Sequence, residues 1–302
     1  MHHLVKQPIE LAMSSSAVGW MTQRRVRGMR LILAYHGIIP KGQAPAGERA
    51  LFVGQREFAL HLDMLAAEAD VAPLDRIDEP GDGRPRVAIT FDDAYSGAVN
   101  EGVRELAKRA LPATIFVAPG RLNGHVFWWD ALSHRSEALD ATVRHHALHE
   151  LAGADERIRA WAVSAALPVS DAMPAYARAA TRAELAAALA VPGITVGSHT
   201  WSHRNLATLG VSDVVAEVRD SREWLHAEFG DKALDWLAYP YGLDSSEVHR
   251  ALAEASYTGA VRTDGGWHRP TDVSPFARPR FSIGSRLGVA GLRARLNGAR
   301  LT

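Results

Sequence analysis

The chain has 302 residues, in which 34 lysines and arginines balance 34 aspartates and glutamates. A formal charge near zero argues against a nucleic-acid partner, because affinity for nucleic acids rests mainly on neutralising phosphates. The chain contains no cysteine. Disulfides and thiolate chemistry are therefore excluded, and a metal site would need histidine and carboxylate ligands.

The first thirty residues contain no uninterrupted apolar core, because Lys6, Pro8, Glu10 and three serines interrupt it. Such a segment is a poor signal peptide, and no apolar run of the chain reaches the roughly 18–20 residues of a membrane span. We therefore expect an N-terminal extension over residues 1–29 and a cytoplasmic protein without a transmembrane segment. The basic run at 24–30 is interpreted as a solvated face, with docking to the anionic inner face of a membrane as the alternative.

From residue 30 onwards, short apolar runs alternate with amphipathic helical patterns. Strands are predicted at 30–35, 86–91, 113–118, 193–198, 234–239, 257–261 and 279–283. Helices are predicted near 55–69, 97–110, 212–229, 244–255 and 286–297. Strands separated by helices are typical of βαβ units around a parallel sheet. The fold class is therefore predicted as α/β.

One long stretch does not follow this alternation. Residues 121–190 are rich in alanine and helical in pattern, and we expect a helical insertion between two strands, with a loop bounded by Pro168 and Pro174. The whole of 30–302 is then one catalytic-type α/β domain.

Four predicted strands end in polar residues that can bind a metal or an oxyanion. These residues are His36, the pair Asp92 and Asp93, the pair His199 and His203, and the Pro240-Tyr241 segment. In parallel α/β barrels the active site is built at the carboxyl ends of the strands. The sequence therefore predicts that these side chains meet at one rim.

The stretch "VAITFDDAYSG" (87–97) places two adjacent carboxylates at the end of an apolar run, which costs desolvation and mutual repulsion. A divalent cation would favour both ionised carboxylates. His199 and His203 would share one face if a helical turn begins there. Two histidines and one aspartate leave an open position for water, as in catalytic zinc sites. Taken singly, the aspartates also fit a turn or a helix N-cap, and the histidines a surface pair.

These motifs resemble those of the polysaccharide deacetylases of carbohydrate esterase family 4, the nodulation-deacetylase homology domain, over about residues 30–285. "TFDDA" (90–94) is similar to the first family motif, TFDDG, and "SHTWSH" (198–203) contains the second, H-[ST]-x-x-H. "YPYG" (239–242) is similar to the third, usually R-x-P-Y. "AYHGI" (34–38) resembles the opening of the bacterial branch that contains poly-N-acetylglucosamine deacetylases.

The resemblance implies a distorted (β/α) barrel that hydrolyses the N-acetyl groups of amino sugars with one divalent metal ion. Asp93, His199 and His203 would bind the metal, for which zinc is the first choice and nickel, cobalt or manganese would also be accepted. Asp92 would be the general base that takes a proton from the metal-bound water. The backbone N–H of Tyr241 would help to hold the oxyanion.

Three departures from the family pattern change these expectations. Ala94 replaces the usual glycine, a mild change if the backbone there avoids positive φ. The arginine that orients the base in the third motif is absent, and Arg278 or Arg280 is expected to supply its charge. The C-terminal L-x-H motif that supplies the general acid is missing, and His36 is the predicted substitute, with a structural histidine as the alternative.

Substrate contacts are expected from Tyr239, Pro240, Trp267 and Arg280. Trp267 ends "TDGGW" (263–267), which is similar to the fourth family motif, D-x-x-x-W, with one residue missing. "FWWD" (127–130) offers two tryptophans on which a sugar could stack, and at least one of them is expected in the core.

The predicted partner is an N-acetylated carbohydrate: a polysaccharide, an oligosaccharide or a carrier-linked precursor. A related hydrolase of a non-sugar amide and a non-catalytic glycan-binding barrel are the alternatives. The intact Asp92 and Asp93 argue against a pure binder, which has no need for a free base beside a metal ligand. The oligomeric state is left open.

Overall fold

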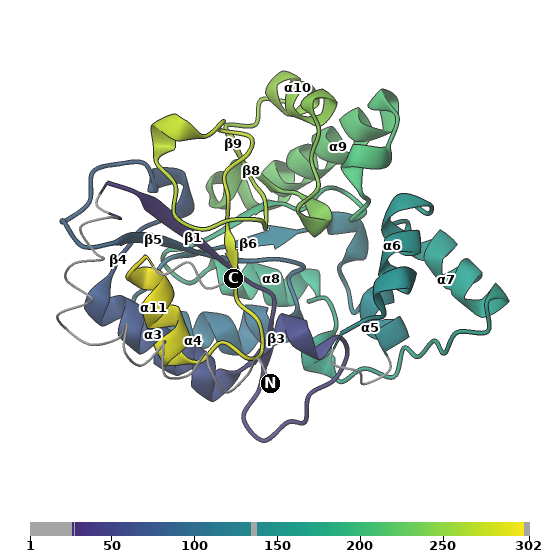
Figure 1. Ribbon diagram of the computed structural model, residues 1–302, viewed down its shortest axis with the longest axis horizontal. Helices are drawn as coiled ribbons and strands as arrows, with labels where there is room; N and C mark the ends of the chain where they lie inside the picture. The colour runs from purple at the N-terminus through teal and green to yellow at the C-terminus, as the bar shows by residue number, and fades with distance from the viewer. Residues whose placement is uncertain (1–25, 27, 134–137, 299–302) are drawn as a thin grey trace.

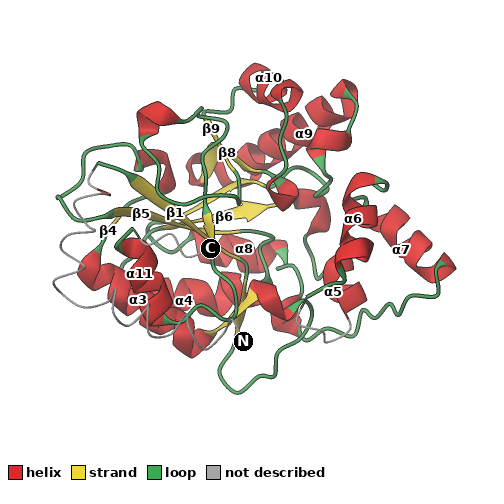
Figure 2. Ribbon diagram, in the orientation of Figure 1, coloured by secondary structure: helices red, strands yellow, loops and turns green. Residues whose placement is uncertain are grey.

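A curled parallel sheet forms the centre of the chain, which a computed structural model describes over residues 26, 28–133 and 138–298. The strand order is β10-β1-β5-β6-β7-β8-β9, and β4 lies beside β5. Helices surround this half-barrel (Figures 1 and 2). The strands are β1 (Arg30–Tyr35), β4 (Asp70–Val71), β5 (Arg86–Phe91), β6 (Ala113–Val117), β7 (Ile194–Ser198), β8 (Ala233–Ala238), β9 (Gly259–Val261) and β10 (Phe281–Ser282). The predicted α/β class and distorted barrel are confirmed, and each predicted strand overlaps an observed one.

The register of the sheet brings the carboxyl ends of its strands level. Tyr35 at the end of β1 pairs with Phe91 at the end of β5, and the Asp92 N–H donates to the Tyr35 carbonyl at 2.9 Å. Likewise, Val117 of β6 pairs with Ser198 of β7. Because all these strands are parallel, the polar residues that follow them emerge at the same edge.

The helices divide into those that cover the sheet and those of the insertion. In Figure 1, α3, α4 and α11 lie together at one side, while α5, α6 and α7 extend from the other. The helices are α3 (Gln55–Glu68), α4 (Val103–Ala107), α5 (Trp128–Ser133), α6 (Ala141–His149), α7 (Asp155–Ser164), α8 (Arg182–Leu189), α9 (Val211–Phe229), α10 (Ser246–Glu254) and α11 (Val289–Leu296).

The predicted insertion at 121–190 is helical in its described part, and a loop runs between Pro168 and Pro174 as expected. Its last helix, α8, packs against β7 and is therefore the crossover helix of the β6–β7 connection. One predicted helix also differs in detail: the 97–110 pattern begins with a π-helical turn at Ala98–Gly102 before α4.

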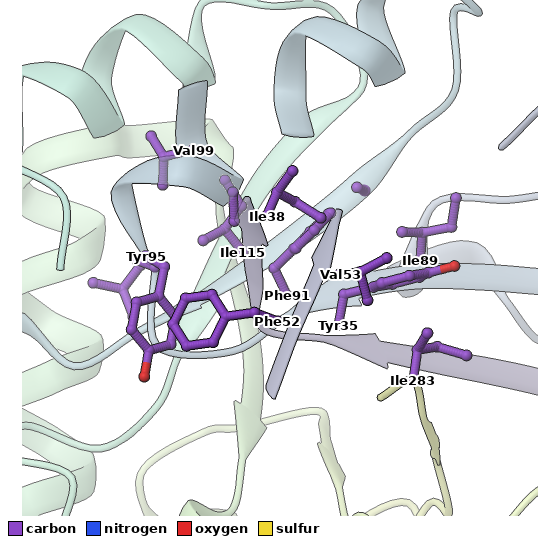
Figure 3. Close-up of a cluster of buried hydrophobic side chains, with 14 of the residues drawn as sticks. Tyr35, Ile38, Phe52, Val53, Ile89, Phe91, Tyr95, Val99, Ile115 and Ile283 are labelled. Atoms are coloured by element: carbon purple, nitrogen blue, oxygen red, sulfur yellow. The ribbon is translucent and has the colours of Figure 1, made fainter. Parts of the chain in front are cut away.

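A cluster of buried hydrophobic side chains includes Tyr35 and Phe91, the last residues of β1 and β5 (Figure 3). The ring of Tyr35 meets that of Phe58 edge-on at 5.1 Å between centroids, and Phe91 packs against both. A two-stranded sheet of β2 (Gly37–Ile39) and β3 (Phe52–Gly54) covers this cluster. The Cβ of any other residue at Gly37 would lie 2.2 Å from the Phe52 ring, so the close approach of β2 to the Phe52 side chain requires glycine.

The N-terminal part of the chain is described only in part. Most of the predicted 1–29 extension, with Arg24, Arg25 and Arg27, lies outside the described residues. Arg30 is half-buried, and its guanidinium donates to the carbonyls of Asp78 and Glu79, so it belongs to the fold rather than to a solvated face. Within the described ranges, no helix combines the length and the apolar character needed to cross a bilayer.

Phe52→Ala should lower the free energy of unfolding by about 3–5 kcal/mol, the usual cost of truncating a buried phenylalanine. The Phe52 side chain is 1% exposed and meets Tyr95 and Tyr176 edge-on. Urea denaturation measures the change. Leu60→Ala on the exposed side of α3 is the control and should have a small effect, because Leu60 is 42% exposed. Equal losses from the two variants would contradict this account of the core.

Candidate active site

A cavity of about 220 Å³ opens at the carboxyl end of the sheet. Its lining includes six of the residues that the sequence nominated: His36, Asp92, Asp93, His199, His203 and Tyr241. They follow four strands, β1, β5, β7 and β8, so the strand ends do converge on one site. The cavity is small beside the roughly 300–1,000 Å³ of drug-sized ligand sites, so it fits a small ligand group.

Asp93, His199 and His203 form the innermost group of this cavity. The Asp93 Oδ1 atom lies 3.1 Å from His203 Nε2 and 3.5 Å from His199 Nε2, and the two imidazole nitrogens are 3.1 Å apart. All three residues are buried. The described part of the chain gives Asp93 Oδ1 no hydrogen bond.

The hydrogen bonds of the two Nδ1 atoms indicate the tautomer of each imidazole. They show which ring nitrogen carries the proton and which keeps a lone pair toward Asp93. His199 Nδ1 lies 2.7 Å from the Ala238 carbonyl, which can only accept, so Nδ1 carries the proton. His203 Nδ1 lies 3.2 Å from the Tyr241 hydroxyl. Both Nε2 atoms are then free to act as ligands, an arrangement typical of metal-binding histidines. Three converging lone pairs in a buried space fit a divalent cation.

The backbone of this rim is left-handed at five residues other than glycine. They are Asp93 (φ 68°), Ala94 (φ 49°), Thr200 (φ 62°), His203 (φ 61°) and Tyr241 (φ 62°). Non-glycine residues adopt this conformation at a cost of about 1–2 kcal/mol each. Such strain is concentrated at functional sites.

Two conditions that the sequence analysis left open are not met by this backbone. His199 and His203 do not share a helical face, because residues 199–203 form a turn in which the His203 N–H donates to Thr200 Oγ1 at 3.0 Å. The turn itself, rather than helical spacing, brings the imidazoles together. Ala94 does not avoid positive φ, so alanine here holds a conformation that glycine would adopt more easily.

Asp92 is held by a guanidinium that comes from the far end of the chain. Arg280 donates to both carboxylate oxygens, at 2.7 and 2.6 Å, and also to Thr90 Oγ1 and the Arg262 carbonyl. Burial alone would raise the pKa of Asp92, but the charge and hydrogen bonds of Arg280, together with His199 and His36, outweigh burial and hold that pKa below its usual value. Of the two arginines expected to supply a charge here, Arg280 is therefore the one that lies against Asp92. Arg278 pairs with Asp78 instead.

The two carboxylates also act on the histidine nearest to them. Burial lowers the pKa of His199, but Asp92 and Asp93 together outweigh that effect and raise it. At His203, burial and the neighbouring His199 lower the pKa.

His36 lines the same cavity as the group of Asp93, His199 and His203. Its Nε2 atom is 3.9 Å from Asp92 Oδ2, and its buried Nδ1 has no partner in the described residues. The side chain is partly exposed to the cavity, 15%, whereas Asp92 is 2% exposed. His36 is therefore placed where it can reach both Asp92 and a bound molecule.

Four residues expected to contact substrate do not line the cavity. Tyr239 is buried and donates to the Phe276 carbonyl, and Pro240 is buried beside it. Trp267 donates to the Arg295 carbonyl, and Arg280 is fully buried against Asp92. Direct contact between these side chains and a substrate would require each to leave these positions, so the structure favours a supporting role.

Two further lining residues come from the insertion, and only Arg144 was not singled out from the sequence. Trp129 of the "FWWD" stretch is buried, stands 4.8 Å from His203 between ring centroids, and lines the cavity, while Trp128 donates to the Tyr241 hydroxyl. Arg144 of α6 also lines the cavity and forms an ion pair with Glu48. The helical pattern of the insertion carried no signal that Arg144 would reach the strand ends.

A buried acid, Asp130, lies beneath this wall and joins the insertion to the barrel. It accepts hydrogen bonds from the Tyr95 hydroxyl at 2.6 Å and from the Glu48 N–H at 2.8 Å. Burial raises the pKa of Asp130 to about 7, although these two hydrogen bonds oppose the shift. The acid therefore titrates near neutral pH.

Comparison with known proteins gives one family and several related folds. The model of the polysaccharide deacetylase family matches residues 80–260, more than half of the chain. No curated protein matches the sequence significantly.

Three solved structures cover nearly the whole barrel. The deacetylase PplD of Streptococcus pyogenes, solved with acetate, has a TM-score of 0.62 and 17% identity, over 89% of this chain and 99% of its own. IcaB from Ammonifex degensii has a TM-score of 0.61 and 17% identity, over 90% and 98%. A de-N-acetylase from Aggregatibacter actinomycetemcomitans has a TM-score of 0.60 and 13% identity, over 88% and 98%. At these identities the similarity shows a shared fold.

Asp130→Asn should remove one component of the pH dependence of stability. Between about pH 4 and pH 7 the folded protein retains a proton on Asp130 that the unfolded chain has released. The free energy of unfolding therefore falls as pH rises, by up to about 1.4 kcal/mol per pH unit from this group. Asparagine mimics the neutral acid and lacks this slope.

Urea denaturation at pH 5 and pH 7 measures the effect. The difference in unfolding free energy between the native protein and Asp130→Asn should shift by about 2 kcal/mol in favour of the variant at the higher pH. Asp231→Asn, at an exposed position, is the control and should show no such shift. Parallel stability curves for the native protein and Asp130→Asn would contradict a raised pKa.

Proposed function

The chain belongs to the polysaccharide deacetylase family, and we propose that it hydrolyses the N-acetyl group of an acetylated amino sugar with the help of one divalent metal ion. It is a carbohydrate deacetylase, a hydrolase of carbon–nitrogen bonds. The observation that carries the finer proposal is the buried group of Asp93, His199 and His203. Next to it in sequence, and lining the same cavity, is Asp92, whose carboxylate is not part of that group. The PplD structure contains acetate, the second product of such a reaction.

Asp93, His199 and His203 would hold the ion, and zinc suits two imidazoles and one carboxylate. The ion would lower the pKa of water and polarise the acetyl carbonyl. The Ala238 carbonyl and the Tyr241 hydroxyl form hydrogen bonds with the Nδ1 atoms of His199 and His203. These hydrogen bonds fix the orientation of each ring and therefore of its Nε2 atom, the proposed ligand.

Asp92 would act as the general base. Its carboxylate is ionised because Arg280 compensates its charge, and it lines the cavity beside the Asp93 group. In the proposed reaction, Asp92 takes a proton from the water molecule whose oxygen bonds to the acetyl carbon. Arg280 fixes the direction of the carboxylate through two hydrogen bonds and is a positioning residue.

His36 and the Tyr241 segment would complete the reaction. His36 donates a proton to the sugar nitrogen as the carbon–nitrogen bond breaks, which leaves a free amine and acetate. The Tyr241 N–H would stabilise the developing oxyanion from the 3₁₀ turn at Pro240–Gly242. The cytoplasmic location and the 30–302 domain boundary remain predictions from the sequence.

Acetate release from N-acetylglucosamine oligomers tests the proposal. The zinc-loaded protein should release acetate, and a chelator should abolish the release until zinc is restored. Asp92→Asn should lower kcat at least 100-fold, the typical contribution of a general base, while metal analysis still finds one bound ion. His203→Ala should instead lose the ion. Release that survives chelation would rule out the metal mechanism, and no release from any acetylated sugar would rule out the substrate class.

His36→Ala should lower turnover about 100-fold, because the leaving amine then lacks a proton donor. Metal content and the KM for the oligomer should change little, since His36 is not one of the proposed ligands. Steady-state kinetics with parallel metal analysis make the measurement. His226→Ala is the matched control. His226 lies on α9, pairs with Asp235 of β8 and does not line the cavity. Normal turnover in His36→Ala would reassign the general acid.

A further inference from the structure

A second cavity, of about 570 Å³, lies beside the active-site cavity. The two share one segment of chain: Gly47 and Arg49 line the second cavity, and the next residues, Ala50 and Leu51, line the first. This segment leads into β3, which lies near α5 of the insertion in Figure 1. A substrate of two or more linked units could therefore extend from one cavity into the other.

Hydrogen bonds fix the walls of the second cavity on both sides. The Tyr176 hydroxyl donates to the Ala44 carbonyl at 2.5 Å, and the Ser170 N–H donates to the Ala131 carbonyl at 3.0 Å. Gly47 sits directly on Asp130, where any Cβ would lie 2.3 Å from the carboxylate oxygen. The cavity lies between the loops at 43–47 and 170–174, and these contacts hold both loops in place.

Arg49 is the charged residue among the lining residues of this cavity. Its Nε atom is buried, and its guanidinium makes no hydrogen bond or ion pair with any part of the described chain. Other arginines with a buried, partnerless Nε, such as Arg204 and Arg278, are held through another guanidinium nitrogen. A buried donor without a partner is uncommon in folded proteins and calls for a ligand.

Neighbouring carboxylates do not compensate the charge of Arg49. Glu48, its neighbour in sequence, accepts from Arg144 with both oxygens. Asp171 follows the lining residue Ser170 but pairs with Arg159 at 2.8 Å. No acidic side chain lines the second cavity. Arg49 therefore contributes one unpaired positive charge.

We propose that the second cavity binds an anionic group of the saccharide substrate, a carboxylate or a phosphate, through Arg49. The group is carried by the unit linked to the acetylated sugar that occupies the first cavity. A guanidinium matches the planar geometry of a carboxylate or phosphate with several N–H donors. This inference rests on the proposed function, because it assumes that the first cavity holds the acetylated sugar.

Binding to the inert Asp92→Asn protein, loaded with zinc, tests the inference without turnover. Isothermal titration calorimetry compares a neutral tetramer of N-acetylglucosamine with a hyaluronan tetrasaccharide, in which glucuronate alternates with N-acetylglucosamine. A second pair, the N-acetylglucosamine disaccharide and its 1-phosphate, in which the phosphate is on the linked unit, distinguishes a carboxylate source from a phosphate source. We expect one charged ligand to bind about tenfold more tightly than its neutral partner at low salt.

The added substitution Arg49→Gln should abolish this preference, and Arg49→Lys should keep part of it. Arg56→Gln removes the same charge from an exposed position on α3, away from both cavities, and should keep the full preference. Circular dichroism checks that each variant is folded. The inference is overturned if neither charged ligand is preferred, or if the preference survives Arg49→Gln.

The same experiment separates this inference from the proposed function. Acetate release from the neutral oligomer by the native protein tests the deacetylase reaction alone. A preference that depends on Arg49, without acetate release from any ligand, would keep the anion site and reject the reaction. Acetate release without such a preference would keep the reaction and reject the anion site.

Discussion

Two adjacent carboxylates, buried at the end of a central strand, are the constraint on which the site depends. Asp92 and Asp93 are 2% and 4% exposed, and both have pKa values held below the usual range. Two like charges persist in such a place only if opposite charge lies close to each. The fold supplies Arg280 to one of them and places two imidazoles against the other. The two aspartates can therefore take different tasks.

The means of separating them is a left-handed backbone. Consecutive residues of a regular strand point to opposite faces, so a strand alone would send one carboxylate into the core. Asp93 and Ala94 leave the strand with positive φ, and the Asp93 carboxylate turns toward His199 and His203. Local hydrogen bonds, such as the one from the His203 N–H to Thr200, hold the opposing turn in place. The surrounding hydrogen bonds thus hold these strained residues in the geometry of the site.

The insertion and the β2–β3 region shape the cavity that the sheet leaves open. Arg144 from α6 binds Glu48, and Asp130 from α5 accepts hydrogen bonds from Tyr95 and Glu48. The contacts with Glu48 join segments more than 80 residues apart in sequence. The sheet thus positions the reactive groups, while the insertion determines the wall of the cavity and the neighbouring space around Arg49.

The sequence by itself determined the strands, the parallel α/β class and the residues of the rim, because apolar runs and strand-end motifs are local signals. It also nominated Asp93, His199 and His203 as a group. It could not choose between Arg278 and Arg280, since they are two residues apart and only the path of β10 along β1 decides which guanidinium reaches Asp92. It left open the turn at 199–203 and the φ of Ala94, which only the backbone conformation of the rim shows. The tertiary structure alone decided that Tyr239, Pro240 and Trp267 lie behind the cavity while Arg144 lines it, because burial is a property of packing rather than of any motif.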